Sequence, residues 1–288
     1  MKIFYSPKCL EYGAIGHPEN CFRVENTAKF LQEKGFSFTE PNPCAVDDLL
    51  LAHSEELVAK VKSGQFFDSD TPNYTGIYNT AILAAGSAIN AMNSALHNKV
   101  AFSLMRPPGH HAGRNFLGGF CYFNNIAIAV AKALENKEMN KAAIIDFDNH
   151  HGNGTQDIFL NDKWHDKVLY ISLHQSPCYP GTGLKNEKNC INFPMTSGTG
   201  GAEYLKDFHK AIEHVKRFNP DMIAVSAGFD SYKNDPLTAL ELDINTFKEI
   251  GKRIADLKKH VFAILEGGYS QELPECVWKF LDGVETSV

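Results

Sequence analysis

The 288-residue sequence predicts an α/β protein, a single domain built on a central, mostly parallel β-sheet that is flanked by helices. Short β-rich runs alternate with helical stretches of ten or more residues, a pattern that is typical of such a sheet. No internal repeat and no long Pro/Gly/Ser-rich linker divides the chain, so one domain is expected over residues 1–288. Polar or glycine-rich residues also follow five of the predicted strands directly.

The predicted elements alternate along the chain. Six helices are expected, at 23–34, 54–63, 77–97, 124–136, 202–217 and 245–259. Five strands are expected, at 99–104, 142–147, 167–173, 222–227 and 261–265. The segments that follow these strands read RPPGHHAG, DNHHGNG, HQSPCYPGTG, GFDSYKNDP and EGGYS. Because the ligand site of an open parallel sheet lies beyond the carboxyl ends of its strands, we expect these segments to form one shared site.

The composition of the chain excludes several classes of protein. A net charge of −6 and a pI near 6.1 leave no basic excess for a nucleic acid partner. Seven cysteines, an odd number without a Cys-x-x-Cys pair, indicate reduced thiols rather than a disulfide framework. The first residues, MKIFYSP, lack the apolar core of a signal peptide, and no apolar run reaches about 18 residues. We therefore expect a soluble cytoplasmic protein with neither a nucleic acid nor a membrane partner.

The second predicted strand ends in DFDNHHGNG, residues 146–154, where a buried run gives way to charge. Side chains alternate across a strand, so Asp146, Asp148 and His150 are expected on one face. Two carboxylates and an imidazole on one face indicate a divalent metal, although the cluster could also be a hydrogen-bonded strand terminus.

Asp230 in SAGFDSY follows another strand, and taken alone it is a typical cap or turn residue. Together with Asp148 and His150 it would complete a set of three ligands that leaves a position open for water and substrate, as a catalytic site requires. The oxygen-rich set suits Zn²⁺, and Fe²⁺ or another divalent ion could compete.

Two further segments carry candidates for acid–base and oxyanion chemistry. RPPGHHAG places His110 and His111 in a loop, where adjacent histidines are either surface residues or, beside a metal, general acid–base groups. Asp146 and Asn153 are candidates to fix the histidine tautomers through hydrogen bonds. LEGGY places Tyr269 after a Gly-Gly turn, either as a packing residue or as a hydroxyl donor to an oxyanion opposite the metal.

Six motifs in order, RPPGHHA, GGFCYFNN, DFDNHHGNGTQ, ISLHQSPCYPGTG, SAGFDSYKNDPL and LEGGY, together resemble the zinc-dependent histone deacetylase superfamily. The resemblance is closest to its class II and bacterial deacetylase-like branches and runs from about residue 16 to 270. It implies the arginase/deacetylase fold, with a mostly parallel sheet of about eight strands. It also implies a deacylase that hydrolyses the amide of acetyl-lysine or a related acylated amine to a carboxylate and a free amine.

The resemblance also implies roles for individual residues by motif position. It assigns the zinc ligands to Asp148, His150 and Asp230. It makes His111 the principal general base, His110 its electrostatic companion and Tyr269 the residue that polarises the carbonyl. It implies a structural K⁺ near Asp146, Asp148, His150, Ser172 and Leu173, and a second monovalent site around Phe159 and Asp162.

The acyl-lysine tunnel implied by the resemblance has five lining positions and one outlet. Phe120 and Tyr179 would form its walls, the Gly119 carbonyl would lie near the substrate amide, and Leu237 would lie at its mouth. Asp70 would hold the substrate backbone, and Arg23 would line an internal channel for acetate exit.

Some positions depart from the common pattern of the family. Asn153 replaces the aspartate of class I members, as is common in class II. Tyr179 replaces a phenylalanine, and Leu237 takes the place of an acidic gatekeeper, which argues against a strong preference for cationic acetylpolyamines.

Alternative functions remain to be compared with acetyl-lysine hydrolysis. The same machinery could hydrolyse acetylpolyamines or other small amides. A catalytically silent acyl-lysine binder is disfavoured because Tyr269, both histidines and all three metal ligands are present. A binuclear manganese ureohydrolase is disfavoured because the strand ends show no additional bridging ligands.

Overall fold

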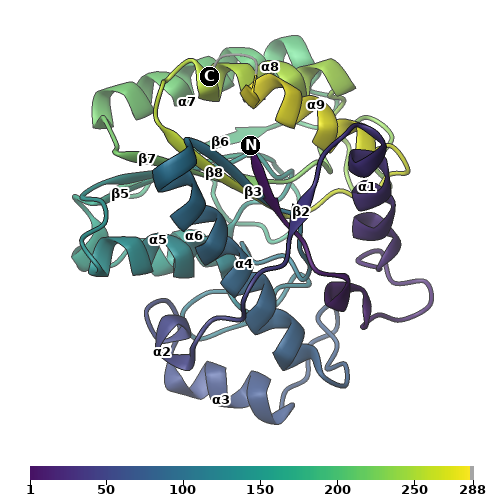
Figure 1. The fold of residues 1–288 in the computed structure, drawn as a ribbon. Coiled ribbons are helices and arrows are strands. Elements are labelled where there is room, and N and C mark those ends of the chain that lie inside the picture. Colours follow the sequence, from purple (N-terminus) through teal and green to yellow (C-terminus); the bar gives the residue numbers. More distant parts are fainter. Residues whose placement is uncertain (286–288) are drawn as a thin grey trace.

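Eight strands form one sheet within residues 1–285, the part of the chain that the computed structural model describes (Figure 1). Their order is β2-β1-β3-β8-β7-β4-β5-β6, and neighbouring strands are all parallel. The strands are β1 (Lys2–Phe4), β2 (Phe38–Thr39), β3 (Val100–Ser103), β4 (Ala142–Asp146), β5 (Val168–Gln175), β6 (Cys190–Met195), β7 (Met222–Ala227) and β8 (His260–Leu265). The predicted α/β fold is confirmed, and residues 286–288 of the predicted domain range lie outside the described residues.

Helices cover both faces of this sheet. They are α1 (Phe22–Glu33), α2 (Val46–Leu49), α3 (Glu55–Ser63), α4 (Ile77–Asn98), α5 (Asn125–Glu135), α6 (Asn153–Phe159), α7 (Gly201–Phe218), α8 (Ile244–Ala255) and α9 (Leu273–Glu285). Figure 1 shows α7, α8 and α9 over one face, and α4, α5 and α6 over the other. Within residues 1–285, none of the helices is long and apolar enough to cross a membrane.

The central strands are mostly apolar because each of their faces enters a separate core. In β4, Ala143 and Ile145 pack into the core on one side of the sheet. Ala142 and Ile144 of the same strand pack into the core on the other side. A strand buried on both faces has few places for charge, so the charged side chains of the site begin where β4 ends, at Asp146.

The sequence predictions match the longer elements and miss the shorter ones. The predicted strands correspond to β3, β4, β5, β7 and β8, and the predicted helices to α1, α3, α4, α5, α7 and α8. The predicted end of the helix at residue 259 is wrong, because α8 ends at Ala255 and Lys258, with φ of 54°, turns the chain into β8. Strands β1, β2 and β6 and helices α2, α6 and α9 were not predicted.

A buried cation anchors the loop that follows β3. The Arg106 side chain is fully buried and donates to both carboxylate oxygens of Glu19, at 2.7 Å each. It also donates to the carbonyls of Cys9 and Tyr12, at 2.9 and 3.0 Å. Despite burial, the Arg106 guanidinium lowers the pKa of the Glu19 carboxyl. This ion pair connects the N-terminal segment to the RPPGHHAG loop.

Candidate active site

Three potential metal ligands meet at the carboxyl edge of the sheet. Asp148 and His150 follow β4, Asp230 follows β7, and one ligand atom of each lies within 4.8 Å of the others. His150 Nδ1 is 2.9 Å from Asp230 Oδ2 and 3.3 Å from Asp148 Oδ1. Both carboxylates are fully buried. Burial and the neighbouring Asp148 charge raise the pKa of Asp230. Two buried carboxylates with one imidazole between them fit a divalent cation.

The backbone holds the two carboxylates in place. Gly267 N donates to Asp148 Oδ2 at 2.7 Å, and Asn149 N donates to Asp230 Oδ1 at 2.8 Å. A Cβ at Gly228 would lie 2.1 Å from Asp148 Oδ2, so this position requires glycine. Each carboxylate therefore has one oxygen oriented by an N–H group and a second close to His150.

The two histidines of the RPPGHHAG loop lie beside this cluster with opposite protonation preferences. His110 Nδ1 is 3.1 Å from Asp146 Oδ2, and His111 Nδ1 is 2.8 Å from Asn153 Oδ1. Burial disfavours charge on His110, but the carboxylates of Asp148 and Asp146 outweigh it and raise its pKa to about 10. Burial and the charges of His110 and His150 lower the pKa of His111 well below 6.5. His111 is thus held neutral, with its Nε2 free to accept a proton.

A cavity of about 270 Å³ leads from the surface to these groups. Its lining consists of Asp70, Pro108, His110, His111, Gly119, Phe120, His150, Tyr179, Leu237, Gly267 and Tyr269. Tyr179 and Leu237 are 45% and 38% exposed, which places them at the outer end. A Cβ at Gly119 would lie 2.4 Å from His111 Cδ2, so glycine lets the wall approach the histidine closely.

Tyr269 lines both this tunnel and a second cavity. The second cavity measures about 600 Å³ and is lined by Tyr269 and Arg23, among others. The Arg23 guanidinium lies 4.6 Å from the centroid of the Tyr269 ring and donates to the carbonyls of Glu266 and Gly268. Burial raises the pKa of the Tyr269 phenol well above 10. Tyr269 therefore stays a hydrogen-bond donor at neutral pH.

Comparison with known proteins agrees with this geometry. The family model described as Histone deacetylase domain matches residues 17–284. The chain belongs to the histone deacetylase family. A probable deacetylase of Archaeoglobus fulgidus is 41% identical over 281 residues, which cover 89% of this chain and 77% of that protein. A histone deacetylase-like amidohydrolase of Pseudomonas aeruginosa is 32% identical over 305 residues, covering 96% and 79%.

Solved structures show the same fold. The crystal structure of the HDA15 HD domain has a TM-score of 0.91 and 30% identity, and the alignment covers 100% of this chain and 89% of that one. The crystal structure of an acetylpolyamine aminohydrolase from Burkholderia pseudomallei has a TM-score of 0.92 and 24% identity. The alignment covers 100% of this chain and 99% of that one, and at this identity it shows a shared fold. As a histone deacetylase family member, this chain is a hydrolase of amide bonds with deacylase activity.

The residues that the sequence predicts for monovalent ions lie in two places. Ser172 of β5 pairs in register with Asp146 of β4, and its Oγ is 2.9 Å from His174 Nδ1. Leu173 follows Ser172 in the same strand. The Phe159 carbonyl accepts a bond of 3.0 Å from Asn189. Asp162 is exposed and pairs with Lys188 at 2.8 Å.

Sequence reasoning missed two buried carboxylates of the site. Glu266 is fully buried and accepts hydrogen bonds from Gly109 N, His110 N and Ser226 Oγ, at 2.7, 3.2 and 3.1 Å. Asp235, with an exposure of 6%, accepts from Tyr269 N. Their position after a strand could have indicated a role in the site, because Glu266 directly follows β8 and Asp235 follows β7.

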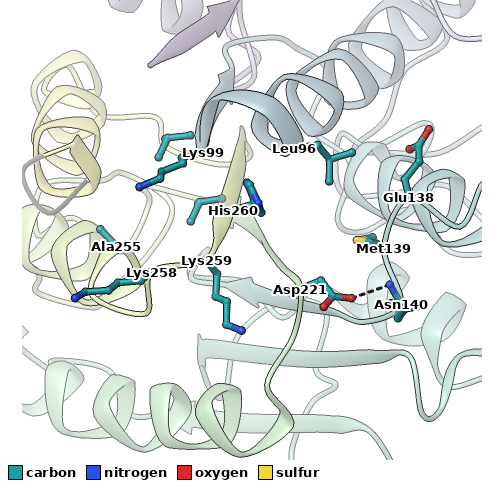
Figure 2. A pocket seen from close by; sticks show the side chains of 12 residues that line it. Leu96, Lys99, Glu138, Met139, Asn140, Asp221, Ala255, Lys258, Lys259 and His260 are labelled. Carbon is teal, nitrogen blue, oxygen red and sulfur yellow. Dashed lines mark hydrogen bonds between the residues drawn. The ribbon is translucent and has the colours of Figure 1, made fainter.

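A larger cavity of about 830 Å³ lies at the opposite, amino edge of the sheet (Figure 2). Lys99 and Lys258 come shortly after α4 and α8, where positive charge interacts favourably with helix C-termini. Figure 2 shows the ammonium groups of Lys99, Lys258 and Lys259 apart from one another. Asp221 there accepts bonds from the backbone of Asn140. Lys99 and Lys258 thus have a structural explanation, and the candidate active site is the tunnel, where the histidines and His150 of the metal-ligand triad lie.

Replacing Asn153 by aspartate is expected to move the acidic limb of the kcat/KM profile to higher pH by about one unit or more. His111 must be neutral to accept a proton, and a carboxylate on its Nδ1 would stabilise the imidazolium and raise its pKa. The profile is measured from acid to alkaline pH in both proteins. Asn161→Asp, an exposed N-cap residue, is the charge-matched control and should leave the limb in place. An unmoved limb in Asn153→Asp would exclude His111 as the titrating group.

Proposed function

We propose that this chain is a metal-dependent deacylase that hydrolyses acetyl-lysine in a peptide or protein, or a related acylated amine. The products are a carboxylate and a free amine. The observation that carries the proposal is one narrow cavity lined by His111, Tyr269 and His150, the last of which forms the triad with the buried Asp148 and Asp230.

Asp148, His150 and Asp230 would hold the metal, for which we propose Zn²⁺, with Fe²⁺ as the alternative. The buried excess of carboxylate over imidazole supports a dication. When bound, such an ion acts as a Lewis acid on the acyl carbonyl and lowers the pKa of water to about 7. The proposal also includes a structural K⁺ at Asp146, Asp148, His150, Ser172 and Leu173, and a second monovalent ion at Phe159 and Asp162.

The chain's own groups divide the proton transfers among them. His111 accepts the proton of the attacking water, because its Nδ1 is committed to Asn153 and its low pKa keeps Nε2 unprotonated. His110 remains protonated against Asp146 and provides positive charge beside the reaction. The Tyr269 hydroxyl donates a hydrogen bond to the oxyanion. A protonated histidine then returns a proton to the leaving amine.

The tunnel would orient the substrate through apolar walls and a few polar atoms. Phe120 and Tyr179 would enclose the acyl-lysine stem, with the Gly119 carbonyl near its amide and Leu237 at the mouth. Asp70, exposed at the rim, would hold the substrate backbone. Arg23 would line the exit route of the carboxylate, which is supported by the second cavity that Arg23 and Tyr269 line together.

We place the protein in the cytoplasm, with no nucleic acid and no membrane among its partners. All seven cysteines are free thiols, and five are buried, which suits a reducing compartment. The net charge of −6 supports the exclusion of nucleic acid.

Tyr269→Phe is expected to retain its metal while kcat for an acetyl-lysine peptide falls by about 10²–10³-fold, since one oxyanion donor is lost. Turnover of the zinc-reconstituted enzyme and metal content are both measured. Acetylputrescine is compared with the peptide in the same assay, because faster hydrolysis of the polyamine would favour the small-amide alternative. Undiminished turnover would remove Tyr269 from the mechanism. Peptide binding without turnover in the wild type would revive the silent-binder alternative.

A further inference from the structure

We infer that Asp235 is a positioning residue that fixes the backbone of Tyr269 and the tunnel rim at Leu237 with one carboxylate. The inference rests on the proposed function, because it concerns how the hydroxyl of Tyr269 is placed. Within residues 1–285, the hydrogen bonds of the Asp235 carboxylate go to the backbone of Tyr269 and Leu237 and not to the three metal ligands. Its effect on the reaction passes through the residue that it holds.

The two oxygens of Asp235 accept from two separate parts of the tunnel wall. Oδ2 accepts from Tyr269 N at 2.6 Å, and Oδ1 accepts from Leu237 N at 3.0 Å. Both Tyr269 and Leu237 line the tunnel. Asp235 itself is only 6% exposed, and its own N–H donates to the Tyr232 carbonyl at 2.8 Å. The carboxylate therefore sits in a fixed turn.

A role in the local turn explains the hydrogen bond from Leu237 N but does not explain the hydrogen bond from Tyr269 N. A carboxylate that accepts from the N–H two residues later is the Asx-turn geometry, and the bond to Leu237 is of this kind. The bond to Tyr269 spans 34 residues and is the shorter of the two. It joins the loop after β7 to the loop after β8, so the turn alone does not account for it.

Tyr269 needs such a clamp because two glycines precede it. Gly268 has φ of 121°, a conformation that other residues rarely adopt, and glycine backbones are intrinsically mobile. Neighbouring groups hold the rest of the loop. Phe229 N donates to the Gly267 carbonyl at 3.0 Å, and Arg23 donates to the Gly268 carbonyl. The Tyr269 N–H is the next polar group, and Asp235 binds it. Because the hydroxyl lies at the far end of the ring, a small backbone rotation displaces it considerably.

A double-mutant cycle tests whether Asp235 acts through Tyr269. An asparagine at 235 can accept at only one of its two positions, so Asp235→Asn loses one bond of the clamp. We expect kcat to fall by at least tenfold, since misplacement by about 1 Å can cost 10²-fold. In the Tyr269→Phe background the same substitution is expected to change kcat by less than about twofold, because there is no hydroxyl left to misplace.

Two further measurements separate positioning from general stability. Hydrogen–deuterium exchange of the peptide that contains Tyr269, or of the peptide that contains Leu237, is expected to accelerate in Asp235→Asn, while metal content is unchanged. Asp243→Asn, the same substitution at the exposed N-cap of α8, is the matched control and should keep kcat within about twofold. If Asp235→Asn does not fold, Asp235→Glu is used in the same double-mutant cycle. This variant keeps the charge but displaces the carboxylate.

The outcomes distinguish this inference from the proposed function. An equal loss of kcat in both backgrounds, or no loss in either, would overturn the positioning role of Asp235. Unaltered exchange at both Tyr269 and Leu237 would overturn it as well. Full activity of Tyr269→Phe alone would instead overturn the proposed mechanism, because the hydroxyl would then have no part in it.

Discussion

Asp230→Asn is expected to lose the bound metal and to lower kcat by about 10³-fold or more, because Lewis-acid catalysis contributes several kcal/mol. The substitution is nearly isosteric. Its amide oxygen can still accept from Asn149 N, while the amide nitrogen beside His150 cannot serve as a ligand. Metal content after dialysis against a weak chelator and turnover of an acetyl-lysine peptide are the two measurements.

The metal-free form of the same variant should be no less stable than the metal-free wild type. Burial and Asp148 raise the pKa of Asp230 in the fold, so its ionised form destabilises the protein as the pH rises from the unfolded-state pKa to the folded one. Removing that charge relieves the repulsion from Asp148. Asp221→Asn, at the opposite edge of the sheet, is the matched control and should retain both metal and turnover. Wild-type metal content and turnover in Asp230→Asn would exclude Asp230 as a ligand.

Arg106→Met is expected to lower the free energy of unfolding by about 3–5 kcal/mol, the loss typical when one partner of a buried ion pair is removed. Glu19 would keep only Arg23 and the Tyr12 hydroxyl as partners, and the carbonyls of Cys9 and Tyr12 would lose their donor. The Glu19 pKa is lowered in the fold, so the stabilisation is present at neutral pH and is lost as the pH falls through that pKa. Urea unfolding at neutral pH measures the loss.

Arg253→Met is the control for this prediction. Arg253 donates to Glu249 Oε1 at 2.8 Å and to the Leu205 carbonyl at 2.7 Å, but its side chain is 28% exposed. A pair of this kind contributes about 0–1 kcal/mol. If both substitutions lowered stability equally, burial would not be the source of the Arg106 contribution.

The central part of the fold was predictable because its strands are long and apolar. A strand such as β7 (MIAVSA) is buried on both faces and cannot be mistaken for a loop. Strands β1 and β2, of 3 and 2 residues, are too short to show a period and are held by backbone pairing to their neighbours. Strand β6 lies at the sheet edge and contains Pro194, which weakens a strand signal.

The sequence predicts those residues of the candidate site whose side-chain type itself indicates their chemistry. Asp148, His150 and Asp230 are recognisable because carboxylates and imidazoles rarely follow buried strands together. Asp235 and Glu266 follow strands as well, but their roles were not recognised because they mainly bind backbone N–H groups, which the sequence does not identify. Glu19 and Arg106 lie 87 residues apart, so their pairing emerges only from the tertiary structure.

The strand order has a consequence for folding. Within residues 1–285, strand pairing joins the two halves of the sheet, β2-β1-β3 and β7-β4-β5-β6, through β8, which follows all the other strands in the sequence. The histidine pair follows β3, whereas the metal-ligand triad follows β4 and β7. Beside the sheet, the histidine loop also contacts the end of β4 and the segment after it directly, because His110 Nδ1 lies 3.1 Å from Asp146 Oδ2 and His111 Nδ1 lies 2.8 Å from Asn153 Oδ1. Closing the sheet requires β3 to pair with β8, at Val100 with Val261, and contacts of such large sequence separation slow the folding of a chain.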